Sequence, residues 1–97
     1  MNIRFLETVI WLAHDRNFRV TSERLHMTQP AISSRIQMIE QELGVRLFER
    51  QAREVTVTPA GEAFVAEARE IIRRYDAMMN RHRRSAELGG LVRIGVP

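Results

Sequence analysis

The residues best suited to recognition chemistry lie between Thr28 and Gln37. They belong to a longer segment, His26 to Ile39, that contains no Asp or Glu although the chain as a whole is rich in both. Small polar side chains can hydrogen-bond to base edges or phosphate oxygens, and they let a helix axis approach a surface closely. An acid-free polar face therefore favours contact with a polyanion. The candidates for such contact are Thr28, Gln29, Pro30, Ser33, Ser34, Arg35 and Gln37.

Two further candidates, Arg50 and Arg53, stand in the segment R-Q-A-R between two short β-prone runs. We interpret the runs, about residues 46–57, as a two-stranded wing whose basic tip contacts phosphate or the minor groove. A plain hairpin with a solvated tip would have the same composition. All 15 basic residues of the chain are Arg, whose guanidinium suits phosphate and guanine. A GC-rich genome would produce the same bias, so this count does not decide between the two interpretations.

Catalytic and metal-binding chemistry find little support. The three histidines, His14, His26 and His82, are far apart and lack the regular spacing of a metal site. The chain has no cysteine and no Gly-rich phosphate loop. Glu40 and Glu42 would point to different faces of a helix, and we interpret Glu40 as a structural partner for an arginine. We therefore expect no enzyme activity, no metal and no cofactor.

Two helical patterns position the recognition residues. The first runs from Phe18 to Leu25 with Asn17 as its N-cap, and His26 and Met27 form the turn after it. The second begins behind Thr28 and stops at Gly44. Its aliphatic residues recur at helical spacing and predict one buried stripe: Ile32, Ile36, Ile39 and Leu43. A short turn between two helices, the second with a polar outer face, predicts a helix-turn-helix over about residues 18–37.

The flanking segments predict two more helices. A first helix, roughly Ile3 to His14, has Phe5 and Trp11 off its apolar stripe, either half-exposed or covered by a partner subunit. A last helix begins at Pro59 behind Thr58 and runs to about residue 87, which is roughly 40 Å and too long for one small globule to cover. Its apolar spacing predicts a helix–helix seam rather than a core helix. The predicted dimer interface comprises Phe5, Trp11, Phe64, Ala68, Ile71, Ile72, Tyr75, Met78 and Met79.

Length and composition bound the rest. The 97 residues make one small domain, with 44% hydrophobic residues and a net charge of +3. No apolar run is long enough to span a membrane, and the amino terminus enters an amphipathic pattern rather than a signal peptide. The expected location is cytoplasmic and nucleoid-associated. A cluster of arginines at 81–84 would stabilise the carboxyl end of the last helix through its dipole. Gly89 and Gly90 predict a hinge, and L-V-R-I-G-V-P after them predicts a strand.

Three stretches carry a resemblance to a known family. They are L-H-M-T-Q-P-A-I-S, I-x-x-I-E-x-E-L-G-V-x-L-F-E-R and V-T-V-T-P-A-G. Together they resemble the amino-terminal domain of LysR-type transcriptional regulators, from Asn2 to about Leu88. The family usually has two alanines where this chain has Thr21 and Ser22, and often a glycine near Glu54.

The resemblance implies a mainly α fold: a winged helix-turn-helix of three helices and a two-stranded wing over residues 1–58, then a linker and dimerisation helix over 59–88. Residues 89–97 would be the hinge and first strand of a missing effector-binding domain. It implies a sequence-specific regulator that binds an interrupted palindrome in double-stranded DNA. The regulator would be a homodimer, or a tetramer at full length, with antiparallel linker helices. A small-molecule effector would act only through the missing domain, and no membrane partner is expected.

A second class of function fits the same elements. A winged-helix protein–protein adaptor could use the long helix as a coiled coil and have no specific DNA site. The discriminating feature is the acid-free outer face from Gln29 to Gln37 together with Arg50 and Arg53, a combination that such an adaptor would not need. The charge pattern therefore favours the DNA-binding interpretation.

Overall fold

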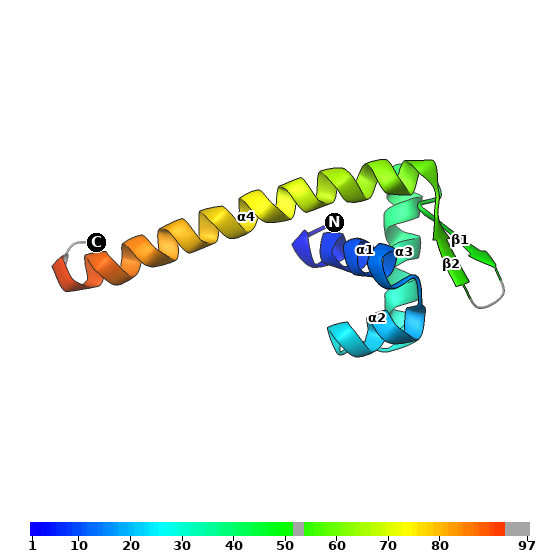
Figure 1. The fold of residues 1–97 in the computed structure, drawn as a ribbon, viewed down its shortest axis with the longest axis horizontal. Coiled ribbons are helices and arrows are strands. Elements are labelled where there is room, and N and C mark those ends of the chain that lie inside the picture. The colour runs from blue at the N-terminus through cyan, green and yellow to red at the C-terminus, as the bar shows by residue number, and fades with distance from the viewer. Residues whose placement is uncertain (52–53, 93–97) are drawn as a thin grey trace.

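A computed structural model describes residues 1–51 and 54–92 of the chain. In chain order it has α1 (Ile3–Asp15), α2 (Phe18–Leu25), α3 (Gln29–Leu43), β1 (Phe48–Gln51), β2 (Glu54–Val57) and α4 (Pro59–Val92). Figure 1 shows α1 to α3 and the wing gathered at one end, with α4 projecting from them. The molecule measures 58 × 25 × 20 Å. This confirms the predicted winged helix-turn-helix followed by a long helix.

The first three helices begin where side-chain oxygens accept backbone N–H groups. Asn2 accepts from the first turn of α1, Asn17 from Val20 at 2.9 Å, and Thr28 from Ala31 at 3.2 Å. Each cap satisfies one or two of the orphan donors at a helix start. The caps predicted at Asn17 and Thr28 are confirmed, and the bounds of α2 match the prediction.

The same three helices end in left-handed backbone conformation. The residues are Arg16 (φ 52°), His26 (φ 55°) and Gly44 (φ 73°). The turn at His26 and the stop at Gly44 are confirmed. The helix α1 ends at Asp15, one residue beyond the expected end, and Arg16 is its C-cap. A non-glycine residue in this region is uncommon, so the two polar residues mark turns that the packing of α1, α2 and α3 enforces.

One apolar core joins α1, α3, the wing and the start of α4. It comprises Val9, Leu12, Ile32, Ile36, Ile39, Leu47, Phe48, Val55 and Val65. Phe48 is 3% exposed and packs the wing onto the core. Leu43, predicted in the buried stripe of α3, is instead 40% exposed. The apolar stripe of α3 extends one turn beyond the part of the helix that the core covers. Leu43 lies in this last turn, where the chain leaves α3 at Gly44 and turns toward the wing.

The wing is a two-stranded antiparallel sheet. Phe48 pairs with Val57 and Gln51 pairs with Glu54, so the strands are in register from base to tip. The N–H of Val55 also donates to the carbonyl of Arg16, 3.4 Å away. This bond ties β2 to the end of α1 and partly covers an edge that a two-stranded sheet would leave open.

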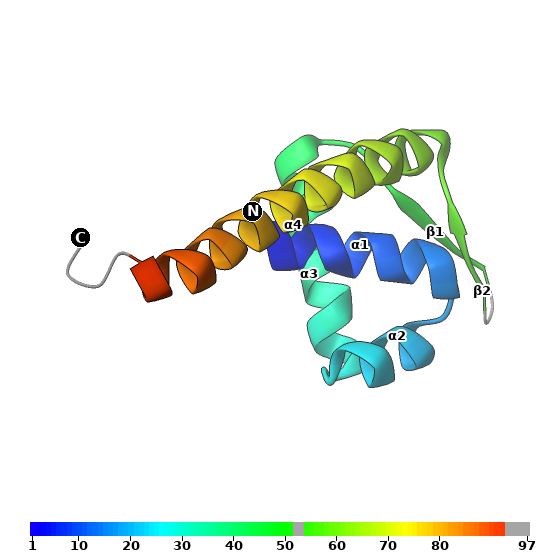
Figure 2. The ribbon, with the colours of Figure 1, turned by 60° about the vertical axis from the view of Figure 1, so that its left-hand side comes forward.

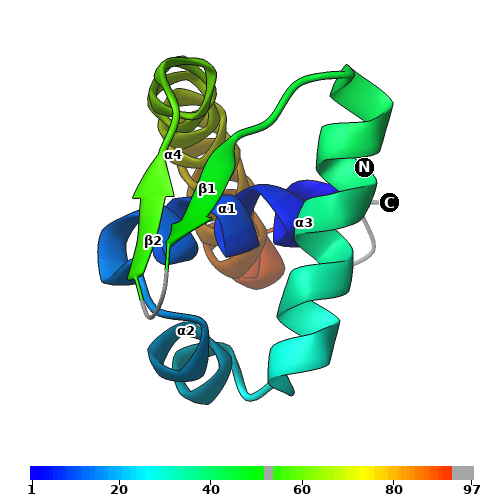
Figure 3. The ribbon, with the colours of Figure 1, turned by 90° about the vertical axis from the view of Figure 1, so that its right-hand side faces the viewer.

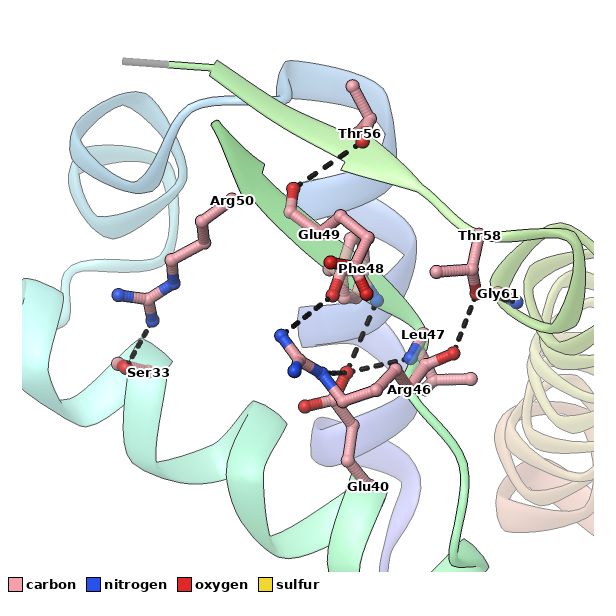
Figure 4. A network of polar contacts seen from close by, with 10 residues as sticks. All are labelled: Ser33, Glu40, Arg46, Leu47, Phe48, Glu49, Arg50, Thr56, Thr58 and Gly61. Carbon is pink, nitrogen blue, oxygen red and sulfur yellow. Dashed lines mark hydrogen bonds and ion pairs between the residues drawn. The ribbon is translucent and has the colours of Figure 1, made fainter. Parts of the chain in front are cut away.

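Glu40 connects the wing to α3 (Figure 4). Its Oε2 accepts from the N–H of Leu47 at 2.7 Å and of Phe48 at 3.2 Å, and it lies 3.6 Å from Nε of Arg46. The side chain is only 13% exposed. The interpretation of Glu40 as a structural partner for an arginine is thus confirmed, and its carboxylate also satisfies two backbone donors of the loop.

The start of α4 lies unusually close to that same loop. Thr58 Oγ1 donates to the carbonyl of Arg46 at 2.6 Å and accepts from the N–H of Gly61 at 2.9 Å. A Cβ atom on Gly61 would stand 2.1 Å from the carbonyl oxygen of Leu47 and 2.8 Å from Cγ1 of Val57. Gly61 therefore permits the helix to pass directly against the backbone of the loop.

Beyond this contact α4 runs beside α1 and then past it, as Figures 1 and 2 both show. It continues through Gly89 and Gly90 to Val92. The helix is therefore continuous at the predicted hinge, and Leu91 and Val92, predicted to begin a strand, are helical. Two glycines cost a helix roughly 2 kcal/mol relative to alanine, but each added residue of a formed helix also gains a hydrogen bond. Positions 93–97 of the predicted strand lie outside the described residues. No helix in the described ranges combines the length and apolarity needed to cross a membrane.

Candidate nucleic-acid interface

The exposed side of α3 carries most of the predicted recognition residues. Figure 3 shows α3 beside the wing, with α2 at the end where α3 begins. Ser33 is half-buried, and it faces the wing. The exposed members of the predicted set are Thr28, Gln29, Pro30, Ser34 and Gln37. The structure thus gathers small, uncharged hydrogen-bonding groups on one helix face, with no carboxylate among them.

Arg35 does not join this face. Its Nη1 donates to Oγ1 of Thr8 at 3.2 Å, and its guanidinium lies 5.2 Å from the centroid of the Phe5 ring. Arg35 flanks the buried stripe of α3 on the side nearest α1, where a buried hydroxyl and a ring face are available. Arg35, predicted among the residues that contact DNA, thus makes its contacts within the domain, to Thr8 and Phe5 on α1.

Arg50 faces α3 from the wing. Its Nη2 donates to Oγ of Ser33 at 2.5 Å, and its guanidinium lies 4.2 Å from the centroid of the Phe18 ring. Phe18, the first residue of α2, was not among the predicted site residues. Nothing in the local sequence pairs a residue of the wing with one 32 positions earlier. The predicted partner of Arg50 at the wing tip, Arg53, lies outside the described residues.

A groove separates α3 from the wing. Its apolar lining includes the buried Ile36 and Phe48 and the exposed Val45. Its polar lining residues are Ser33, Gln37, Glu40, Gln41, Arg46 and Arg50. Of the two arginines, Arg46 is paired with Glu40 and with the carbonyl of Phe48, while Arg50 reaches Ser33.

A set of contacts around Arg24 joins α1 to α2. Arg24 donates to both carboxylate oxygens of Asp15, from Nη2 at 2.8 Å and Nε at 3.1 Å, and Thr21 Oγ1 donates to the same carboxylate at 3.0 Å. The guanidinium of Arg24 also lies 4.2 Å from the centroid of Trp11. Thr21 and Ser22, which replace the family's usual alanines, are buried, and each hydroxyl has a partner.

These contacts predict an acid-sensitive contribution to stability. The hydrogen bonds from Arg24 hold the pKa of Asp15 below its usual value of 3.8, against the opposing effect of burial. A depressed pKa stabilises the fold above the unfolded pKa of about 3.9, and the contribution disappears as the pH falls through the lower folded value. Asp15→Asn should therefore lower the free energy of unfolding at pH 7, and its difference from the parent should shrink below about pH 4. Denaturant unfolding across that range, at fixed protein concentration, measures it.

Glu23→Gln is the matched control, because Glu23 forms an exposed ion pair with Arg19 on the same helix. Exposed pairs contribute little, so this variant should follow the parent at every pH. A difference between Asp15→Asn and the parent that stays constant down to acid unfolding would contradict the role given to the Asp15 anion.

The predicted seam residues of α4 fall into two groups. Ala68 is 2% exposed and Phe64 is half-buried, because both pack on their own domain. Ile72 is half-buried. The exposed group is Ile71, Tyr75, Met78 and Met79, each between 38% and 50% exposed. The expectation that Ala68 meets a partner is corrected, because the first third of α4 is already covered by α1.

The two aromatic residues of α1 are also covered from within the chain. Phe5 packs against the core beneath Arg35, and Trp11 lies beneath Arg24, with its ring 5.5 Å from that of His14. The partner contact was predicted because two exposed aromatic rings on one small helix would otherwise lie in water. Arg35 and Arg24 of the same chain already cover part of these rings. Among the described residues, no group of three or more His, Asp or Glu could hold a metal ion.

Comparisons with known proteins identify one family of transcription regulators. Residues 3–62 match the model of the family described as bacterial regulatory helix-turn-helix protein, lysR family. The uncharacterized HTH-type transcriptional regulator YcgK of Bacillus subtilis is 38% identical over 98 residues, covering 100% of this chain and 30% of its own length. The DNA-binding transcriptional dual regulator OxyR of Escherichia coli is 38% identical over 97 residues, covering 99% of this chain and 32% of its own length.

Solved structures show the same fold. The CbnR_DBD–DNA complex matches with a TM-score of 0.83 and 37% identity, covering 89% of this chain and 99% of that one. The BenM_DBD/catB site 1 DNA complex matches with a TM-score of 0.85 and 32% identity, covering 89% and 96%. The chain spans about a third of the length of the curated relatives that it matches.

Proposed function

Because this chain belongs to the LysR family of bacterial regulatory helix-turn-helix proteins, we propose that it binds specific sites in double-stranded DNA as the DNA-binding part, or reading head, of a transcription regulator. One observation carries the proposal. An acid-free face of α3 lies beside a wing from which Arg50 reaches toward it, on a fold that matches two relatives whose structures include DNA. The adaptor alternative explains neither the absence of carboxylates from that face nor the DNA in those relatives.

Helix-turn-helix geometry indicates which residues of the site would contact bases and which would contact the DNA backbone. The amino-terminal part of the second helix meets base edges in the major groove, while flanking elements contact the backbone. Gln29 and Ser33 would read bases, with Pro30, Ser34 and Gln37 beside them. Thr28 would serve mainly as the N-cap. Arg53 would contact phosphate or the minor groove from the tip of the wing.

A homodimer completes the proposal. The exposed apolar residues of α4, Ile71, Tyr75, Met78 and Met79, support a helix–helix contact with a second copy. Two reading heads related by a two-fold axis would bind an interrupted palindrome. Residues 1–58 would form the reading head and α4 the linker. A small-molecule effector would act through a further domain of the whole protein. The whole protein could also form a tetramer, with contacts that involve this further domain.

Gln29→Ala tests the assignment of the reading face. A lost base contact costs about 1–3 kcal/mol of discrimination and leaves the salt dependence nearly unchanged. A lost phosphate contact reduces the slope of log affinity against log salt by about 0.9. Gln29→Ala should therefore weaken binding to a duplex selected from a random library, but not to a scrambled one. Arg53→Ala should weaken both and flatten the slope.

Gln41→Ala is the matched control, because Gln41 is an exposed glutamine on α3, about 18 Å further along the helix. It should leave discrimination unchanged. Equal losses of Gln29→Ala on selected and scrambled duplexes would show that Gln29 is not a reading residue. A parent chain that binds no selected duplex at low salt would overturn the proposed function itself.

A further inference from the structure

The wing has a contact with the helix-turn-helix beyond its buried base. Phe48 at the base is in the core, as is Val55, which pairs with Arg50 midway along the strands, and Glu40 bonds to the loop before β1. Further along the strands, Glu49, Arg50, Gln51 and Glu54 are exposed. Hairpins without further packing are marginal in water. On the β2 side the wing is held at this level by Val55, which is buried and donates its N–H to the carbonyl of Arg16, whereas β1 depends on the side-chain contacts of its own exposed residues.

Arg50 provides such a contact to two elements at once. Figure 4 shows its side chain leaving β1 toward Ser33 on α3. Its Nη2 donates to Ser33 at 2.5 Å, while the guanidinium lies over the Phe18 ring at 4.2 Å. We propose that Arg50 is a positioning residue that fixes the wing relative to the reading helix, with the ring of Phe18 as its platform. This inference rests on the proposed function and assigns Arg50 a role within it other than a simple phosphate contact.

The chemistry of the contact requires arginine specifically. A guanidinium is planar, stacks on an aromatic face and still presents N–H groups at its edge. A lysine ammonium carries the same charge but cannot combine a planar stack with a directed edge. The contact would therefore not survive replacement by lysine, although a phosphate interaction would.

The same contact sets the hydrogen-bonding character of Ser33. A serine hydroxyl has one donor and two acceptor sites, and Arg50 occupies one acceptor site. Arg50 thus favours an orientation in which the Ser33 hydroxyl donates outward. In the major groove, acceptors are N7 and O6 of guanine, N7 of adenine and O4 of thymine. Arg50 would accordingly influence which base edges the reading helix prefers, without touching them.

The test uses two substitutions that should have the same effect. Arg50→Lys keeps the charge, and Phe18→Leu removes the ring without changing any charge. Each should weaken binding to a selected duplex by about tenfold, with less loss on a scrambled duplex and an unchanged salt slope. The double variant should lose no more than either single one, because both remove one contact. Arg19→Lys, next to Phe18 and paired with Glu23, is the control and should bind like the parent.

Hydrogen exchange in the free protein provides a readout that needs no DNA. Amides of the wing should exchange faster in Arg50→Lys, while those in the middle of α1 and α3 keep the parent rate. Unchanged wing exchange, or Arg50→Lys binding like the parent while Arg50→Ala loses about 0.9 of slope, would make Arg50 a phosphate contact and overturn the inference. Failure of the parent to bind DNA would overturn only the proposed function, since the exchange measurement stands without it.

Discussion

The Gly61→Ala variant is expected to lose about 3 kcal/mol of unfolding free energy, a large part of the 5–15 kcal/mol typical of small domains. At an open helical position the same change would stabilise the protein by about 1 kcal/mol. Here the new methyl group would stand 2.1 Å from the carbonyl oxygen of Leu47, which is backbone and cannot rotate away. The loop from α3 to the wing must then separate from α4. Denaturant unfolding followed by circular dichroism would measure the loss.

Gly44→Ala is the matched control, since it adds the same methyl group where nothing lies within 4 Å. Its cost comes from the left-handed backbone (φ 73°) alone and should be about 1–2 kcal/mol. A Gly61→Ala protein that is as stable as the parent, or more stable, would contradict the close approach of α4 to the loop. Protein concentration must be held constant, because association also contributes to stability.

Tyr75→Asp should dissociate the proposed dimer, with the dissociation constant rising at least about a hundredfold. Tyr75 stands at the centre of the exposed apolar group of α4, flanked by Ile71 and Met78. An aspartate there would have to lose its hydration when two such helices meet, with no partner on the apolar faces to compensate. Sedimentation of the chain at micromolar concentration would measure the shift.

Ala77→Asp adds the same charge two residues further on. At about 100° per residue, Ala77 points roughly 200° away from Tyr75, and it is exposed. This control should leave the association unchanged. A parent chain that is monomeric at micromolar concentration, or equal effects of the two aspartates, would show that the exposed apolar group does not join two copies.

Features set by neighbouring residues could be predicted from the sequence. Asn17 and Thr28 precede helices that they cap, and Gly44 ends one in the conformation that glycine favours. These signals act within four residues, so the bounds of α2 and the start of α3 follow from them directly. The wing could be predicted for a similar reason, since short β-prone runs ending at Phe48 and beginning at Val55 flank the polar segment R-Q-A-R.

Contacts between distant elements could not be predicted in the same way. Periodicity places Arg35 beside the buried stripe of α3, but it does not reveal that Thr8 on α1 accepts its hydrogen bond. Likewise it places Ala68 on the apolar side of α4 without distinguishing the chain's own α1 from a partner. The small size of Ala68 was the available signal, because a small residue in an apolar stripe permits close helix packing. Arg50 and Phe18 meet only after the wing has folded against α2.

The unbroken course of α4 makes this helix a rigid spacer of fixed length. The helix begins at Pro59, directly after the wing, and reaches Val92 without interruption, a length of about 50 Å. In a pair joined through the outer part of this helix, the distance between the two reading heads would be set by stiff geometry rather than by a flexible tether. A stiff spacer gives the second head a high effective concentration at a correctly spaced half-site and almost none elsewhere. Operators would then be selected by the interval between half-sites as well as by the bases within them.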